Sequence, residues 1–139
     1  LSDTFFEFFV NNEKLYRFLK KYDIIGAVPI SKSRKRERGY NQSELIARKI
    51  AKTLLIPFEN VLIKTKNNSP QSNLNKKQRL ENVKNVYKVQ NEQRIKEQNI
   101  LLFDDIYTTG ATANECARML KQAGSKNVGI LTIAKDFKN

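Results

Sequence analysis

Residues 100–112 read ILLFDDIYTTGAT and contain the side chains of this chain that are best suited to chemistry. Asp104 and Asp105 directly follow four apolar residues, and such a short apolar run is typical of a strand buried on both faces in a parallel sheet. In open α/β sheets, ligands bind beyond the carboxyl ends of the strands. We therefore expect the two carboxylates to face a ligand and to contact the hydroxyls of a sugar.

The loop after the two acids is small and polar, which suits a phosphate group. Gly110 permits a close approach of the backbone, and the threonine hydroxyls add hydrogen-bond donors without bulk. The helix that follows has free backbone N–H groups in its first turn, and these favour an anion. The alternative is that the Asp pair only caps a helix and carries solvated charge. The predicted phosphate-binding residues are Tyr107, Thr108, Thr109, Gly110, Ala111 and Thr112.

Segment 100–112 resembles, over its whole length, the phosphoribosyl pyrophosphate (PRPP) signature of type I phosphoribosyltransferases. The segments 27–51, 70–89 and 114–124 resemble the ComF family of competence proteins, so that the resemblance covers about residues 24–135. It implies an α/β fold of the type I phosphoribosyltransferase kind, with a mostly parallel central sheet flanked by helices. It also implies a role in handling single-stranded DNA during natural transformation. Asp104 and Asp105 then become the predicted catalytic pair.

A second part of the site is implied by the same resemblance. Pro29, Ile30, Ser31 and Lys32 match the pyrophosphate loop, which would lie beside the signature loop and oppose the diphosphate of PRPP. Mg²⁺ prefers phosphate oxygens and water to a cage of protein ligands, so we expect it to arrive with PRPP and predict no direct protein ligand. Many phosphoribosyltransferases have glycine in this loop, whereas this chain has isoleucine and serine there.

The first 22 residues are predicted to form an amphipathic helix. Phe5, Phe8 and Phe9 recur at helical spacing with later apolar residues, and Asp3 is available as an N-cap. This apolar face is expected to cover the sheet, and the alternative is that it docks to a partner or to an N-terminal module. Members of the ComF family usually carry an N-terminal zinc module with four cysteines. This chain contains only Cys116, so we expect neither that module nor zinc here.

The remaining pattern alternates strands and helices, which predicts a parallel sheet in a single domain over residues 1–139. A first strand is expected from residue 24, and a helix from Asn41, with Asn41 and Glu44 as a capping box. Pro57 is expected to end that helix, and Gly124 to end the helix that follows the signature loop. Further elements are predicted as strands at 61–65, 86–89 and 128–134, a loop at 66–75 and a short helix at 78–83.

Composition excludes several classes of protein. The chain has 139 residues, of which 40% are hydrophobic, and this suits one core of ordinary size. Because it contains no histidine, zinc hydrolases and Ser-His-Asp enzymes are excluded. A lone cysteine excludes an internal disulfide, and Cys116 is expected to be a packed residue rather than a nucleophile. With no targeting or membrane-spanning segment, we expect a cytoplasmic protein, with a peripheral position at the inner face of the membrane as the alternative.

Charge is the second large signal, since 26 basic and 14 acidic residues give a formal net charge of +12. One cluster lies at residues 32–38, and residues 64–96 contain nine basic and two acidic residues. Such blocks favour polyanions, and Tyr40 or Tyr87 could add stacking with the bases of a single strand. The alternative is a basic composition that only solvates the surface. The predicted nucleic-acid-binding residues are Arg34, Lys35, Arg36 and Arg38.

Three functional hypotheses therefore stay open. The first is a ComF-type protein that handles single-stranded DNA and retains a site for PRPP or ribose 5-phosphate, with other competence or DNA-uptake proteins as further partners. The second is an active phosphoribosyltransferase, although no segment for recognition of an acceptor is identifiable. The third is a regulator whose binding to nucleic acid depends on PRPP. The first accounts for both the signature segment and the basic clusters.

Overall fold

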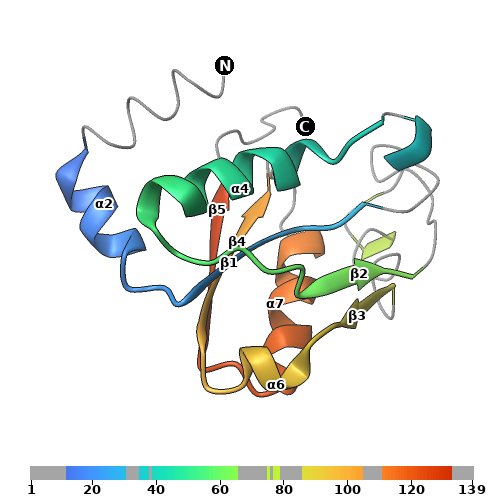
Figure 1. The fold of residues 1–139 in the computed structure, drawn as a ribbon. Helices are drawn as coiled ribbons and strands as arrows, with labels where there is room; N and C mark the ends of the chain where they lie inside the picture. The colour runs from blue at the N-terminus through green and yellow to red at the C-terminus, as the bar shows by residue number, and fades with distance from the viewer. Residues whose placement is uncertain are drawn as a thin grey trace.

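The computed structural model shows a central sheet with helices on both of its faces (Figure 1). The residues that it describes are 12–30, 35–37, 39–65, 75, 77–78, 86–104 and 111–132. The structural account below concerns these residues. The predicted loop at 66–75 and the predicted short helix at 78–83 lie almost wholly outside them, as do Phe5, Phe8 and Phe9.

The central sheet has three parallel strands, in the order β1 (Ile24–Ala27), β4 (Asn99–Asp104) and β5 (Asn127–Thr132). The middle strand, β4, buries four successive apolar side chains, those of residues 100–103. This confirms the prediction of a strand buried on both faces. Phe58 adds a parallel bridge to Ile25 on the outer side of β1, so that the chain continues the sheet there by one short contact.

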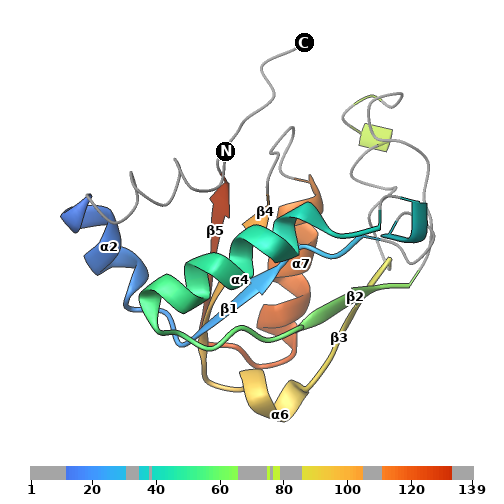
Figure 2. The same ribbon diagram turned by 45° about the horizontal axis from the view of Figure 1, so that its top comes forward.

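One face of the sheet is covered by α2 (Glu13–Leu19) and α4 (Gln42–Leu54), as Figures 1 and 2 show. The N-cap of α2 is Asn12, whose side chain accepts a hydrogen bond from the Leu15 backbone N–H at 3.1 Å. Leu19 is fully buried against this face, which supports the covering role predicted for the N-terminal helix. The apolar residues of this half of the core are Leu19, Ile25, Ile46, Ala47, Ile50, Ala51, Leu54, Ile56, Leu101 and Phe103.

The N-cap of α4 agrees with the sequence prediction, whereas the Glu44 half of the predicted capping box pairs elsewhere. Asn41 is its N-cap, as predicted, because its side chain accepts a hydrogen bond from the Ser43 backbone N–H at 3.1 Å. The carboxylate of Glu44 pairs with Arg48 at 3.0 Å, one turn further along the helix. The helix ends at Leu54, and its C-cap residue, Leu55, adopts the left-handed conformation with φ 58° shortly before Pro57.

The other face of the sheet carries α7 (Ala111–Gln122) and a hairpin formed by β2 (Leu62–Lys64) and β3 (Tyr87–Val89). The hairpin strands pair with each other in antiparallel fashion and form a separate two-stranded sheet. A short helix, α6 (Glu92–Ile95), links β3 to β4. The buried residues of this half of the core are Ile24, Val28, Val61, Leu62, Val86, Tyr87, Ile95, Ile100, Leu102, Cys116 and Leu120.

Candidate functional site

The carboxyl end of β4 lies at the centre of the sheet edge where the sequence predicts a ligand. Asp104 is the last residue of β4, is half-buried, and pairs in register with Thr132 of β5. On the other side, Phe103 pairs with Ala27 at the end of β1. Asp105 lies outside the described residues, so Asp104 is the one member of the predicted pair whose position is known.

Helix α7 begins at Ala111, after a connection of six residues from Asp104. The chain therefore passes from a buried central strand, through an acid at its carboxyl end, to the amino end of a helix with 12 residues. The free N–H groups of such a helix favour an anion. Of the predicted phosphate-binding residues, Ala111 and Thr112 lie in its first turn, and Tyr107, Thr108, Thr109 and Gly110 lie outside the described residues.

Tyr87 of the hairpin brings a buried hydroxyl next to the start of α7. Only 4% of Tyr87 is exposed, and its side chain is hydrogen-bonded to that of Thr112. Burial is the main cause that raises the pKa of the Tyr87 phenol, and the neighbouring Cys116 thiol raises it too. The carboxylates of Asp104 and Glu115 act in the same direction, so both acids lie close enough to Tyr87 to interact with it electrostatically. The phenol is therefore neutral at any ordinary pH.

Two cations lie near Tyr87 and the two acids. The Lys64 amine lies 5.9 Å from the centre of the Tyr87 ring. Glu115 is only 7% exposed, and its two carboxylate oxygens accept hydrogen bonds from Arg118 at 2.8 and 2.7 Å. A buried carboxylate is costly unless it is paired and hydrogen-bonded, and this two-point contact meets that requirement. The Glu115–Arg118 pair stabilises α7 itself, and the Tyr87–Thr112 hydrogen bond links the start of that helix to the hairpin.

The thiol of Cys116 is fully buried in the core beside this network. Burial, followed by the negative charges of Asp104 and Glu115, raises its pKa, while Lys64 lowers it. A thiol with a raised pKa is a poor nucleophile, because the thiolate is the reactive form. This agrees with the prediction that Cys116 is a packed residue.

The end of β1 adjoins the end of β4, as the predicted pairing of the two loops requires. The Val28 backbone N–H donates to the Phe103 carbonyl oxygen at 3.0 Å, and Pro29 and Ile30 follow directly. Ser31 and Lys32, the other two residues of the predicted pyrophosphate loop, lie outside the described residues. Pro29 and Ile30, the described part of that loop, therefore lie beside β4, the strand that ends at Asp104.

The predicted nucleic-acid-binding cluster is located in part. Lys35 and Arg36 are exposed in a short helical segment at residues 35–37, whereas Arg34 and Arg38 lie outside the described residues. Tyr40 is 46% exposed just after this segment and can offer a face for stacking. The prediction of stacking at Tyr87 is wrong, because its ring is buried between the hairpin and α7.

Reasoning from the sequence identified the acids and the loop but missed the buried contacts around Tyr87 and Glu115. The only signal for Glu115 is the spacing of three residues to Arg118, which fits a pair on one helix. In the described part of the chain, no cluster of three or more His, Cys, Asp or Glu side chains could hold a metal ion. Within the same part, no helix is long and apolar enough to cross a membrane.

Comparison with known proteins gives the following matches. Residues 41–138 match a protein family described as "Phosphoribosyl transferase domain". The chain is 30% identical over 128 residues to "Competence protein F" of Haemophilus influenzae, covering 91% of this chain and 56% of that protein. It is 36% identical over 104 residues to "Competence protein ComFC" of Bacillus subtilis, covering 75% of this chain and 40% of that protein. The chain thus spans about half the length of these relatives.

Among solved structures, the purine phosphoribosyltransferase of Pyrococcus horikoshii matches with a TM-score of 0.54 at 17% identity. The match covers 88% of this chain and 66% of that one. At this level of identity, the likeness concerns the fold alone. Together with the order of the parallel strands and the helices on both faces, it confirms the predicted type I phosphoribosyltransferase-like α/β fold.

Proposed function

Because the chain belongs to the phosphoribosyl transferase domain family and to its ComF branch, we propose that it is a competence protein that handles single-stranded DNA and binds PRPP or ribose 5-phosphate. The sugar phosphate would bind at the carboxyl end of β4. The ribose hydroxyls would contact Asp104 and Asp105, and the 5′-phosphate would lie at the amino end of α7. Single-stranded DNA would bind through the basic cluster that contains Lys35 and Arg36.

The observation that carries the sugar-phosphate site is the course of the chain around Asp104. This half-buried acid ends the central strand of the sheet, and α7 begins after a connection of six residues, with the N–H groups of its first turn favouring an anion. The hydrogen bond between Tyr87 and Thr112 links the first turn of α7 to the β2–β3 hairpin. A phosphate would therefore meet backbone groups that need little rearrangement, which favours binding.

Magnesium would come with the diphosphate of PRPP. Mg²⁺ prefers phosphate oxygens and water to a cage of protein ligands, so the diphosphate would supply its ligands, and the Asp104 carboxylate at the sheet edge would be left for the ribose. When bound, the ion would neutralise charge on the diphosphate. The part of the protein itself would be to orient the ribose through Asp104 and to hold its 5′-phosphate at α7.

Handling of single-stranded DNA is supported by charge and by exposure. The net charge is +12, Lys35 and Arg36 are exposed, and the ring of Tyr40, a few residues later in the chain, is 46% exposed. Neutralisation of phosphates and stacking of bases on aromatic rings are the two contributions that bind single strands without regard to sequence. The relatives named as competence proteins support the coarser role in competence.

Transfer of the phosphoribosyl group to an acceptor is the second candidate function, and the family match over residues 41–138 favours it. Release of pyrophosphate from labelled PRPP in the presence of a base would support it. In the third hypothesis, PRPP regulates binding to DNA. Since coupling between two sites is reciprocal, PRPP and DNA would then change each other's affinity by the same factor.

The sugar-phosphate site is tested by calorimetric titration of PRPP with excess Mg²⁺ into the wild type and into Asp104→Asn. Hydrogen bonds to a charged group contribute about 1.5–3 kcal/mol, so we expect the affinity to fall by about tenfold or more. Gly110→Val should also weaken binding, because a branched side chain would occupy the space of the phosphate.

The matched control is Glu92→Gln, which removes an exposed carboxylate from α6, on the segment that leads into the amino end of β4. It should bind PRPP with the affinity of the wild type. Thermal unfolding of each variant verifies that the fold is retained. Equal affinities for the wild type and Asp104→Asn, both folded, would contradict the proposed site.

A further inference from the structure

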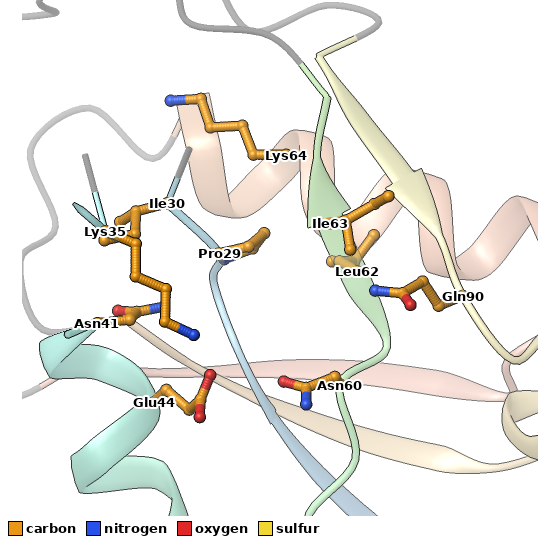
Figure 3. A pocket seen from close by; sticks show the side chains of 10 residues that line it. All are labelled: Pro29, Ile30, Lys35, Asn41, Glu44, Asn60, Leu62, Ile63, Lys64 and Gln90. Atoms are coloured by element: carbon orange, nitrogen blue, oxygen red, sulfur yellow. The ribbon is translucent and has the colours of Figure 1, made fainter. Parts of the chain in front are cut away.

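A pocket of about 270 Å³ opens beside the sheet edge, where three separate parts of the chain meet (Figure 3). Pro29 and Ile30, which follow β1, form one wall. The start of α4 forms the second wall with Asn41 and Glu44, and the β2–β3 hairpin with the residues that flank it forms the third. Its third wall follows the edge of β1 away from β4, because Phe58, just before Asn60, forms a bridge to Ile25 on that edge.

The interior of the pocket combines apolar surface with amide groups. Pro29, Leu62 and Ile63 give it apolar walls, and the side-chain amides of Asn60 and Gln90 border the same space (Figure 3). Neither amide has a hydrogen-bond partner among the described residues. Each carries both donors and an acceptor, which is the combination that matches the polar edge of a heterocyclic base.

The wall at α4 is rigid and ends in a carboxylate. Asn41 uses both polar atoms of its side chain within the fold, since it accepts from the Ser43 N–H and donates to the Val28 carbonyl oxygen at 3.3 Å. Glu44 faces the same pocket and is held by Arg48 at 3.0 Å. An ionised carboxylate only accepts hydrogen bonds, so it favours an amino or ring N–H group and disfavours a free diphosphate.

The two basic stretches of the sequence meet at this pocket. Lys35 comes from the cluster at residues 32–38, and Lys64 is the first basic residue of the stretch 64–96. Figure 3 shows the two side chains on different walls, with Lys35 near Asn41 and Lys64 on the hairpin. A polar, partly apolar pocket between two cations suits one unit of a polyanion whose base enters while its phosphates stay outside.

We propose that this pocket takes one base of a bound single strand, while Lys35 and Lys64 hold the phosphates on either side of it. The inference rests on the proposed binding of single-stranded DNA and adds the place where a base is held. The base would lie against Pro29 and Leu62, and its polar edge would meet the amides and the Glu44 carboxylate. Binding through one pocket of this kind would tolerate most sequences but would require a base.

The test compares a fluorescently labelled single strand with an abasic strand of equal length and equal charge. Fluorescence anisotropy at fixed salt gives the affinity of the full chain for each. Stacking contributes about 1–3 kcal/mol per base, so the wild type should bind the strand with bases about tenfold more tightly. Lys35→Ala should lower the slope of log affinity against log salt by about 0.7 for both strands, as expected for one lost phosphate contact.

Two variants change the pocket in different ways, one by filling it and the other by removing a polar group. Asn60→Trp places a large ring in it from an exposed position, and Gln90→Ala removes an amide without filling the space. Asn60→Trp should bind both strands with the affinity of the abasic strand, and Gln90→Ala should reduce the difference. Gln93→Trp is the matched control, since Gln93 is exposed on α6 and is not part of the pocket. It should keep the preference of the wild type.

The outcomes separate this inference from the function on which it rests. Equal affinities of the wild type for the two strands would overturn the base pocket and leave binding of DNA intact. The base pocket would also be overturned if Asn60→Trp still bound the strand with bases more tightly than the abasic strand. If inorganic pyrophosphate then removed this preference from the wild type, the pocket would be assigned to a diphosphate. Failure of the wild type to bind either strand would overturn both proposals.

Discussion

Removing the hydroxyl of Tyr87 tests whether the hairpin holds the first turn of α7 in place. Tyr87→Phe keeps the buried ring and deletes the hydrogen bond to Thr112. A hydrogen bond within a protein contributes about 0.5–1.5 kcal/mol, and the half-buried Thr112 can exchange its partner for water, so we expect a loss of about 1 kcal/mol. For a chain of 139 residues, this corresponds to a decrease in Tm of about 4 °C.

A double-mutant cycle isolates the contact. Tyr87→Phe, Thr112→Val and the double variant are unfolded in urea, and the free energies of unfolding are compared. The two single variants should each lose stability, and the double variant should lose less than their sum by about 1 kcal/mol. Tyr40→Phe is the matched control, because it removes the same hydroxyl from a ring that is 46% exposed. Its stability should change by less than about 0.5 kcal/mol.

The same variant has a functional consequence. If the hydrogen bond fixes the first turn of α7, its loss should weaken binding of PRPP although Tyr87 itself does not contact the ligand. The affinity should fall by less than the loss expected for Asp104→Asn, because only the position of the helix start changes. Additive single variants, or an unchanged affinity for PRPP in a destabilised Tyr87→Phe, would refute this reasoning.

Two further predictions concern the core. Gly129→Ala should destabilise the fold by about 1–3 kcal/mol, measured by urea unfolding, because a Cβ at this position would overlap the Tyr22 hydroxyl and lie 2.7 Å from its ring carbon Cζ; Tyr22→Leu should relieve most of this cost. Stability should also fall as pH rises above 9, because the folded state keeps the buried Cys116 thiol protonated while the unfolded chain loses its proton. In Cys116→Ala this decrease should be smaller by up to about 1.4 kcal/mol per pH unit, and an identical pH profile would contradict the assignment.

The sequence predicts those parts of the fold whose signals are local. An unbroken apolar run followed by an acid indicated β4, and Asn41 indicated the start of α4, because a strand buried on both faces and an N-cap each leave a mark within a few residues. Gly124, with φ 108°, marks the end of α7 for the same reason. The family resemblance added the strand order that links these elements.

The contacts that arise between distant segments could not be predicted. Tyr87 lies in the basic stretch 64–96 and was interpreted as one of two residues that could stack with bases, but α7 packs over the hairpin and buries its ring. The pocket beside β1 depends on residues near positions 30, 41, 62 and 90, and no pattern within any one segment indicates their meeting. Burial and pocket formation are properties of the packed chain, so they become visible only in the structure.

The most direct test of the central claim is a crystal structure of the protein with ribose 5-phosphate and Mg²⁺. The account predicts ribose hydroxyls hydrogen-bonded to Asp104 at the end of β4, with the 5′-phosphate at the first turn of α7. A well-ordered sugar phosphate bound elsewhere on the intact fold, with Asp104 in contact only with protein, would contradict it.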